Sequence, residues 1–197
     1  PVVSSAASDV YKRQYLKSRV SETLGLLYAD HFPYRQVETA RNVRQSPIHD
    51  RLKGEGACFG EVSGWERANW FLPKAERDAG KPAEYEYSWK RQNWFDHSAD
   101  EHNAVRNHVG MFDLSSFGKI RVVGKDAEAV LQRLCGNDVA VPDGKIVYTQ
   151  FLNEDGHIEA DVTVTRLSSD EFLIVTPAAT VRRDLHWING HIPDGAH

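Results

Sequence analysis

The first part of the chain has only short stretches with a helical period. Between Tyr15 and His31, apolar residues recur at helical spacing, interrupted by Gly25. These residues are Leu16, Val20, Leu24, Leu27 and Tyr28. We therefore expect a helix over this segment. A second, shorter helix is predicted between Pro47 and Gly54, because proline suits a first helical turn and glycine suits the position just past the last turn.

Ser98 and Glu101 introduce a third expected helix. They satisfy the S-x-x-E pattern of a capping box, in which each side chain hydrogen-bonds the backbone N–H of the other residue. The helix should then reach about Val109 and end at Gly110. The preceding residues 72–96 combine prolines, glycine and charges, which is typical of a connecting loop.

Two aromatic segments stand out in the first half of the chain. ACFGEVSGWERANWF contains Trp65, Trp70 and Phe71, and YEYSWKRQNWF follows it inside the expected loop. Rings of this size bury large apolar areas, so the first segment predicts a core or a contact between domains. The second segment is too aromatic for a free linker, and we expect it to lie against a surface.

The second half of the chain alternates between strand and helix periods. A period-two strand around residues 119–123 is followed by a helix that ends at Gly136. One face of that helix carries Ala127, Val130, Leu131 and Leu134. Two further strands should form a hairpin, because Asp155 and Gly156 between them readily adopt the positive backbone angles of a tight turn.

Alternation is clearest along the second strand of this hairpin. One side carries Ile158, Ala160, Val162 and Val164, and the other carries Glu159, Asp161, Thr163 and Thr165. A last strand, EFLIVT, and a helix with Val181, Leu185 and Ile188 complete a β-α-β-β-β-α order. Because a short turn joins two of the strands, the sheet must be at least partly antiparallel, which places the domain in the α+β class.

Composition and charge exclude several classes of protein. The chain has 197 residues, a net charge of -4 and interspersed charges, so it lacks the clustered basic footprint of a nucleic-acid-binding protein. Cys58 and Cys135 form no CxxC motif, which argues against a zinc site and fits a reducing compartment. The histidines show no metal-binding spacing, and no segment approaches the ~20 apolar residues of a membrane span. We assign no metal, no nucleic-acid partner and no membrane partner.

Residues 1–14 differ from the rest of the chain. PVVSSAASDVYKRQ has no sustained apolar period and resembles translated adaptor sequence, so we expect an artefactual or disordered leader outside the fold. It also lacks the apolar core of a secretory signal. Together with the cysteine usage, this favours a cytoplasmic location.

Three blocks of the sequence resemble a tetrahydrofolate-binding domain. They are GMFDLSSFGKIRVVG, LQRLCGNDVAVPDG and IVYTQFLNEDGHIEADVTV. In order and spacing they are similar to the first half of this domain in two families, the glycine-cleavage aminomethyltransferase (T-protein) and the flavin-dependent dimethylglycine and sarcosine dehydrogenases. GACFGE…GWERANWF and the SSFGK form resemble the dehydrogenases, and we expect no counterpart of GWERANWF in the stand-alone T-protein.

The resemblance implies a domain organisation. Residues 15–90 would be a mixed segment, the C-terminal end of a flavin oxidoreductase module with its linker. Residues 91–197 would be the N-terminal half of an α+β folate-binding domain of the T-protein type. FAD would bind in a module outside this chain, since no GxGxxG follows a strand here. We therefore expect an internal fragment of a larger enzyme that is inactive by itself.

The resemblance also assigns site residues. Asp161 would be catalytic, beside the folate nitrogen that takes up the one-carbon unit, where a carboxylate can accept a proton from an amine or orient it. Phe117, Tyr148 and Thr163 would bind tetrahydrofolate together with Asp161. The residues alone leave other roles open, because an acid on a polar strand face is commonly just solvated and Tyr148 can equally be a cross-strand packing aromatic.

One position departs from the T-protein pattern. Pro177 stands where the T-protein has an asparagine that can hydrogen-bond the ligand, and proline offers no donor. Our hypothesis is a dimethylglycine or sarcosine dehydrogenase-like enzyme, in which flavin oxidises the N-methyl group of a small methylamine and tetrahydrofolate captures the carbon. The alternatives are an aminomethyltransferase without flavin and a non-catalytic module, such as the regulatory subunit of pyruvate dehydrogenase phosphatase.

Overall fold

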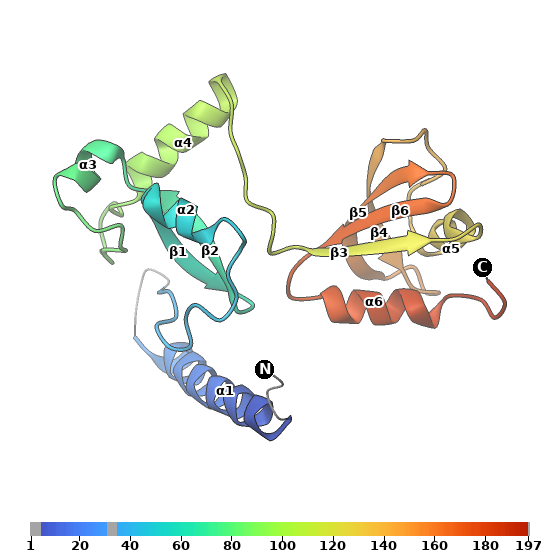
Figure 1. Cartoon of the computed structure of the whole chain (residues 1–197), viewed down its shortest axis with the longest axis horizontal. Coiled ribbons are helices and arrows are strands. Elements are labelled where there is room, and N and C mark those ends of the chain that lie inside the picture. The colour runs from blue at the N-terminus through green and yellow to red at the C-terminus, as the bar shows by residue number, and fades with distance from the viewer. Residues whose placement is uncertain (1–4, 31–34, 197) are drawn as a thin grey trace. The chain divides into compact units, whose positions relative to one another are not determined.

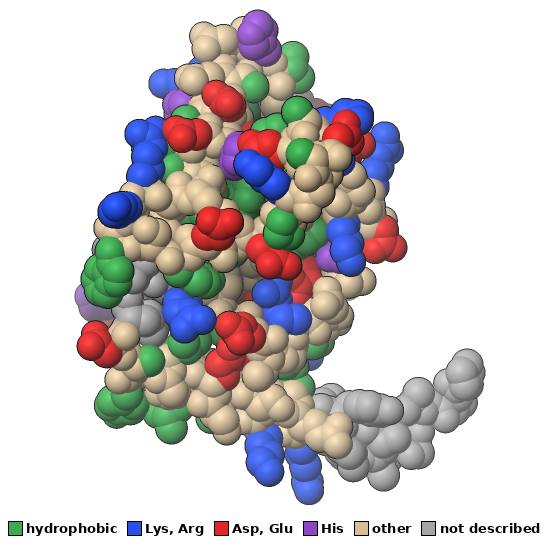
Figure 2. Space-filling view, turned by 90° about the vertical axis from the view of Figure 1, so that its left-hand side faces the viewer, with side chains coloured by type: hydrophobic (Ala, Val, Ile, Leu, Met, Phe, Trp, Pro, Cys, Tyr) green, Lys and Arg blue, Asp and Glu red, His purple; other side chains and the backbone are tan. Residues whose placement is uncertain are grey.

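Two compact units, Pro1–Ser115 and Ser116–His197, make up the computed structural model of the chain (Figure 1). The structure describes residues 5–30 and 35–196, and for residues 5–12 it describes the backbone alone. Within these ranges no helix has both the length and the apolar character needed to cross a membrane. On the face shown in Figure 2, acidic and basic side chains are interspersed rather than gathered into a patch of one sign.

The first unit combines helices with one antiparallel hairpin. Its elements are α1 (Ser5–Tyr28), α2 (His49–Gly54), β1 (Ala57–Val62), β2 (Trp65–Phe71), α3 (Lys74–Asp78) and α4 (Phe95–Asn107). Ser63 and Gly64 join β1 to β2, and both have positive φ, which is the geometry of a type I′ turn. This turn carries no strong sequence signal at its first position, which explains why the pattern did not predict the hairpin.

Helix α1 is longer than its sequence pattern predicted. The expected helix started at Tyr15, whereas α1 begins at Ser5 and ends at Tyr28. Residues 5–14, which we expected to lie outside the fold, therefore have helical backbone. They contain no proline or glycine that would stop a helix. The expected end at His31 lies outside the described residues. Helix α2 follows its prediction closely and ends at Gly54.

The capping box predicted for α4 is wrong. The helix begins at Phe95, and the N–H of Ser98 already donates to the carbonyl of Trp94 at 2.9 Å. Glu101 instead accepts a hydrogen bond from the backbone N–H of Phe71 at 2.7 Å. This bond joins α4 to β2, so α4 belongs to the first unit. The compact units consequently divide after Ser115 and not near residue 90, where we expected the domain boundary.

The apolar cluster of the first unit combines aromatic and smaller side chains. Cys58, Trp70 and Leu72 are its buried members. Tyr85 and Trp94 from the second aromatic segment pack against them, as expected for a segment that lies against a surface. The prediction of a core from the first aromatic segment is thus confirmed for Trp70, while Trp65 and Phe71 of that segment are only half-buried.

The second unit is an antiparallel sheet with two helices on one face (Figure 1). Its elements are β3 (Gly118–Val123), α5 (Ala127–Leu134), β4 (Ile146–Leu152), β5 (Ile158–Ser168), β6 (Glu171–Thr176) and α6 (Val181–Gly190). The strands lie in the order β3-β6-β5-β4, and every neighbouring pair is antiparallel. The predicted β-α-β-β-β-α order and the α+β class are confirmed.

The core of the second unit lies between the sheet and its helices. The predicted face of α5 is buried in full, with Ala127, Val130, Leu131 and Leu134. It packs in one cluster with Phe151 and Phe172 of the sheet and with Ile188 of α6. On α6, Leu185 is 42% exposed, and the buried position beside it is taken by Asp184.

The hairpin of β4 and β5 is confirmed, but its turn differs from the expected one. Only Gly156 has positive φ in this turn, whereas Asp155 does not. The side chain of Asn153 accepts hydrogen bonds from the backbone N–H groups of Asp155 at 3.1 Å and His157 at 2.9 Å. An asparagine that bonds its own backbone in this way replaces the tight two-residue turn.

Candidate functional site

The predicted site residues lie on the sheet face opposite α5 and α6. Strand pairing aligns one row of residues across the four strands, namely Lys119, Val175, Thr163 and Tyr148. Asp161 lies two residues from Thr163 on the same face and pairs with Gln150 of β4. Burial alternates along β5 as predicted, with Ala160, Val162 and Val164 buried and the site face exposed or half-buried. The structure therefore brings Tyr148, Asp161 and Thr163 into one patch.

Tyr148 and Asp161 interact directly within this patch. They are diagonal neighbours in an antiparallel pair, a separation that long side chains can span. The Asp161 carboxylate raises the pKa of the Tyr148 phenol above its ordinary value, mainly by accepting its hydrogen bond. Gln150 Nε2 lies 3.5 Å from Asp161 Oδ1, at the outer limit of a hydrogen bond. The carboxylate is exposed, so it keeps acceptor capacity for a ligand.

Phe117 and Pro177 stand at the same end of the sheet as Asp161. Gly118 pairs with Thr176, so the next residues outward, Phe117 and Pro177, are level with each other. Val175 of β6 pairs with Thr163 of β5, so Pro177, two residues after Val175, is level with Asp161, two residues before Thr163. With neighbouring strands ~4.8 Å apart, the backbones of Phe117 and Asp161 are roughly 10 Å from each other. Phe117 is half-buried.

This arrangement fits a flat ligand that also carries an amine. The Tyr148 side chain, 59% exposed, offers a ring face for an aromatic heterocycle. The Asp161 carboxylate can accept a proton or a hydrogen bond from a nitrogen placed above the strand. Thr163 adds a hydroxyl that can donate or accept. These side chains suit tetrahydrofolate, which combines a pterin-type ring with a reactive amine.

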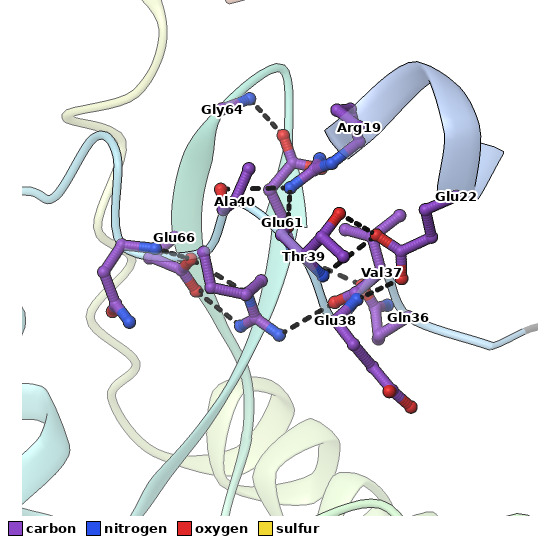
Figure 3. A network of polar contacts seen from close by, with 12 residues as sticks. Arg19, Glu22, Gln36, Val37, Glu38, Thr39, Ala40, Glu61, Gly64 and Glu66 are labelled. Carbon is purple, nitrogen blue, oxygen red and sulfur yellow. Dashed lines mark hydrogen bonds and ion pairs between the residues drawn. The ribbon is translucent and has the colours of Figure 1, made fainter. Parts of the chain in front are cut away.

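A polar network that the sequence pattern did not predict lies in the first unit (Figure 3). Arg41 donates to Glu66 from Nε at 2.9 Å and from Nη2 at 2.5 Å. Glu66 is 4% exposed and also accepts a hydrogen bond from the N–H of Asn42 at 2.6 Å. Burial by itself raises the pKa of Glu66, but the bonds from Arg41 and Asn42 outweigh burial and hold this pKa below its ordinary value.

Helix α1 joins the same network through two charged side chains (Figure 3). Arg19 pairs with Glu61 of β1 and donates to the carbonyl oxygen of Thr39 at 2.6 Å. Glu22 accepts hydrogen bonds from the backbone N–H groups of Glu38 and Thr39, the latter at 2.9 Å. Residues 36–42 are thus clamped between the helix and the β1–β2 hairpin.

A cavity of about 490 Å³ adjoins this network and includes Arg41 and Glu66 in its lining. Two tyrosine hydroxyls in its lining already bond within the chain. Asn69 donates to the hydroxyl of Tyr85 at 2.7 Å, and the N–H of Gln36 donates to the hydroxyl of Tyr87 at 2.8 Å. We therefore interpret the network as a clamp that holds the hairpin. Arg41 and Glu66 are 25 positions apart in sequence, so no local pattern could pair them.

Neither cysteine is activated. Burial raises the pKa of Cys58 to about 11 and that of Cys135 to about 12. Both thiols are free, and such values keep them protonated and poorly nucleophilic at neutral pH. Among the side chains that the structure describes, no three His, Cys, Asp or Glu residues gather in a way that could hold a metal ion.

Two models of known families match the chain. The GCVT N-terminal domain matches residues 48–197, and the FAD dependent oxidoreductase central domain matches residues 9–46. The GCVT match begins inside the segment 15–90, which we expected to come from the flavin module. It includes GWERANWF, so this block does not separate the dehydrogenases from the aminomethyltransferase as we had expected.

Curated relatives match most of this chain but only part of their own length. It is 48% identical to 4-methylaminobutanoate oxidase (formaldehyde-forming) of Paenarthrobacter nicotinovorans, over 93% of this chain and 22% of that protein. It is 34% identical to the mitochondrial pyruvate dehydrogenase phosphatase regulatory subunit of Mus musculus, over 92% and 21%. It is 32% identical to mitochondrial sarcosine dehydrogenase of Homo sapiens, over 79% and 19%. The chain thus spans about a fifth of each relative.

A solved structure supports the same fold. The glycine cleavage system aminomethyltransferase T from Bartonella henselae superposes with a TM-score of 0.61 at 22% identity, covering 79% of this chain and 37% of that protein. This likeness confirms the predicted fold of the T-protein type. The chain therefore belongs to the GCVT N-terminal domain family, and a segment that matches the FAD dependent oxidoreductase central domain precedes that domain.

Proposed function

We propose that this chain is the tetrahydrofolate-binding part of a flavin-dependent enzyme that oxidises the N-methyl group of small amino acids. Bound FAD would supply the oxidation of the methyl carbon, and bound tetrahydrofolate the amine that captures this carbon as 5,10-methylenetetrahydrofolate. The observation that carries the proposal is the placement of Tyr148 and Asp161 as diagonal neighbours on the open sheet face of a GCVT N-terminal domain, where the Asp161 carboxylate raises the pKa of the Tyr148 phenol.

The side chains of the patch would have distinct tasks. Asp161 would orient the reactive folate nitrogen and accept its proton, while the phenol of Tyr148 donates to the carboxylate and fixes its direction. Thr163 would add a polar contact to the ring system, and Phe117 would close the apolar side. Pro177 offers neither a side-chain donor nor an N–H, so ligand contact at that position would be apolar.

The names of the relatives support a substrate class, N-methyl amino acids, but not a single cellular compartment. Two of them are named for N-methyl amino acids, 4-methylaminobutanoate and sarcosine. We propose a substrate of this class, with a secondary or tertiary methylamine and a carboxylate. The mammalian relatives are named mitochondrial, whereas we propose a cytoplasmic location for this protein, supported by its two free cysteines.

The proposal is tested by Asp161→Asn in the complete enzyme that contains this chain. We expect flavin reduction by the methylamine to stay unchanged and the yield of methylenetetrahydrofolate to fall about 100-fold, the usual contribution of a positioned acid–base group. Glu159→Gln is the matched control, because it makes the same change two residues away on the same strand face. An equal yield from the Asp161 variant and this control would remove Asp161 from the mechanism.

A second candidate function follows from the names of two relatives. The Paenarthrobacter enzyme is described as formaldehyde-forming, and the mouse relative is a regulatory subunit. If the complete enzyme reduces flavin but releases formaldehyde in the presence of tetrahydrofolate, the folate role is wrong. If the chain binds tetrahydrofolate within a protein without oxidase activity, a regulatory module is favoured. An aminomethyltransferase without flavin is disfavoured by the FAD oxidoreductase match at residues 9–46.

A further inference from the structure

Helix α6 buries a carboxylate in its first turn, beside the end of the candidate site. Asp184 is 1% exposed and accepts hydrogen bonds from the hydroxyl groups of Thr176 and Thr180, the latter at 2.7 Å. Arg183 donates to the same carboxylate from Nε and Nη2, both at 3.1 Å. An acid in a first turn complements the helix dipole, but its burial is costly unless its acceptor sites are used. All of these donors lie at one corner of the fold.

The Asp184 carboxylate fixes the corner between β6 and α6. Thr176 is the last residue of β6 and pairs with Gly118, the first residue of β3. The N–H of Thr180 donates to the carbonyl oxygen of Pro177 at 3.2 Å, which closes the turn. A Cβ atom at Gly118 would lie 2.4 Å from Val181 Cγ2, so α6 leaves no room for a side chain there. The corner therefore sets where β3 and β6 meet the candidate site.

Arg183 extends this hold to the strand that carries Asp161. Strand β6 ends at Thr176, which is level with Val162 of β5. The residues of β5 before Val162 therefore pair with β4 on one side and with no residue of β6 on the other. In this part of β5, the carbonyl oxygen of Glu159 accepts a hydrogen bond from Arg183 Nη2. The Arg183 guanidinium thus supplies a hydrogen bond that a neighbouring strand would otherwise make, at a residue two positions from Asp161.

We propose that Arg183 and Asp184 are positioning residues for Asp161. Together they link the end of β6, the first turn of α6 and the half-paired end of β5 into one rigid unit. A guanidinium suits this task because its planar fork can reach a carboxylate and a carbonyl at once, which an ammonium group cannot. The Arg183 side chain is 59% exposed and adds little to the core, so its loss should move β5 without unfolding the sheet.

The test compares Arg183→Met with Arg182→Met, which removes a neighbouring exposed arginine of the same helix. The first readout is the affinity of the complete enzyme that contains this chain for tetrahydrofolate, which rests on the proposed function. We expect Arg183→Met to weaken it roughly tenfold, the effect of disturbing one hydrogen bond to a charged group. The second readout is the NMR titration of the Tyr148 phenol, whose raised pKa depends on the position of Asp161. This pKa should fall toward its ordinary value.

Each outcome separates the two proposals. If Arg183→Met equals Arg182→Met in both readouts, or weakens binding with no change in the Tyr148 titration, the positioning role is wrong. If the unaltered complete enzyme does not bind tetrahydrofolate but Arg183→Met still shifts the Tyr148 titration, the positioning role stands and the proposed function fails. Arg183→Lys keeps the charge without the planar fork, so it should lower the Tyr148 pKa by less than Arg183→Met does. If Arg183→Met does not fold, Arg183→Lys provides the same test.

Discussion

In the second unit, 13 residues of the sheet, its helices and a loop are buried in one apolar cluster, whereas the described cluster of the first unit has three buried members. In the first unit, charged pairs occupy the space between elements, with Arg41 on Glu66 and Arg19 on Glu61 (Figure 3). Apolar burial is roughly proportional to area and has no preferred direction. Ion pairs repay their desolvation only in good geometry, so they fix one arrangement more than they add stability.

This difference predicts different responses to the loss of a single side chain. Each unit also has its own reporter, because Cys58 lies in the first unit and Cys135 in the second. Both thiols become reactive mainly when their surroundings open, since burial raises the pKa of each. Thiol labelling can therefore assign a loss of stability to one unit.

The largest effect is expected from Phe172→Ala in the second unit. Phe172 is fully buried in the apolar cluster, and truncating such a ring costs about 3–5 kcal/mol of unfolding free energy. Urea denaturation should show this loss, and labelling of Cys135 should accelerate while labelling of Cys58 does not. Leu167→Ala, at a position 43% exposed on β5, is the control and should cost less than about 1 kcal/mol. Equal losses from both variants would contradict the assigned core.

A smaller effect is expected from Arg41→Met in the first unit. Removing one partner of a buried ion pair leaves the other charge uncompensated, which costs about 3–5 kcal/mol in full burial. Because the Arg41 side chain is 26% exposed, we expect the lower end of this range or slightly less. Labelling of Cys58, which shares a cavity with Arg41, should accelerate. Arg44→Met, at an exposed position, is the control.

The double variant Arg41→Met with Glu66→Gln sharpens this comparison. If the pair serves geometry more than stability, removing both charges should restore much of the free energy lost in Arg41→Met. A double variant that is less stable than the single one would show instead that the pair is a net source of stability.

The same contrast explains which parts of the molecule its sequence predicted. The helix face of Ala127, Val130, Leu131 and Leu134 and the alternation along β5 follow from periods that any short window contains. These periods placed Asp161 and its neighbours on one face before the structure was known. Arg41 and Glu66 come into contact only after folding, so no sequence periodicity predicts their ion pair.

Two departures from the local sequence pattern have the same origin. Leu185 fits the apolar period of α6, yet Asp184 takes the buried position because Thr176 and Thr180 supply its hydrogen bonds. Ser98 and Glu101 match a capping box, yet Glu101 is drawn to the N–H of Phe71 on β2. In both cases a hydrogen bond to a distant element overrides a pattern that is correct locally.

The smallest effects concern pH and two glutamates of the first unit. The pKa of Glu66 is lowered in the fold, so its contribution to stability is present above the unfolded value near 4.5 and is lost as the pH falls through the lower folded pKa. Burial raises the pKa of Glu101, outweighing its bond from Phe71, so its contribution is present below the unfolded value and is lost as the pH rises through the folded pKa.

Substitution by glutamine should therefore give opposite results at the two positions. At neutral pH, Glu66→Gln should lower the urea midpoint of the first unit, because it removes a charge that Arg41 needs. Glu101→Gln should leave the midpoint unchanged or raise it, since its amide oxygen can still accept from the N–H of Phe71 without the cost of a half-buried charge. As the pH falls through the lowered folded pKa of Glu66, the penalty of Glu66→Gln should shrink, because the acid then becomes neutral in the unaltered chain as well. Urea midpoints should be measured from pH 3 to 8, with Cys58 labelling performed after transfer to one common pH. They show whether each glutamine substitution lowers or raises the midpoint. Equal shifts at both positions would mean that the charge of Glu66 contributes no more to the first unit than that of an ordinary half-buried acid.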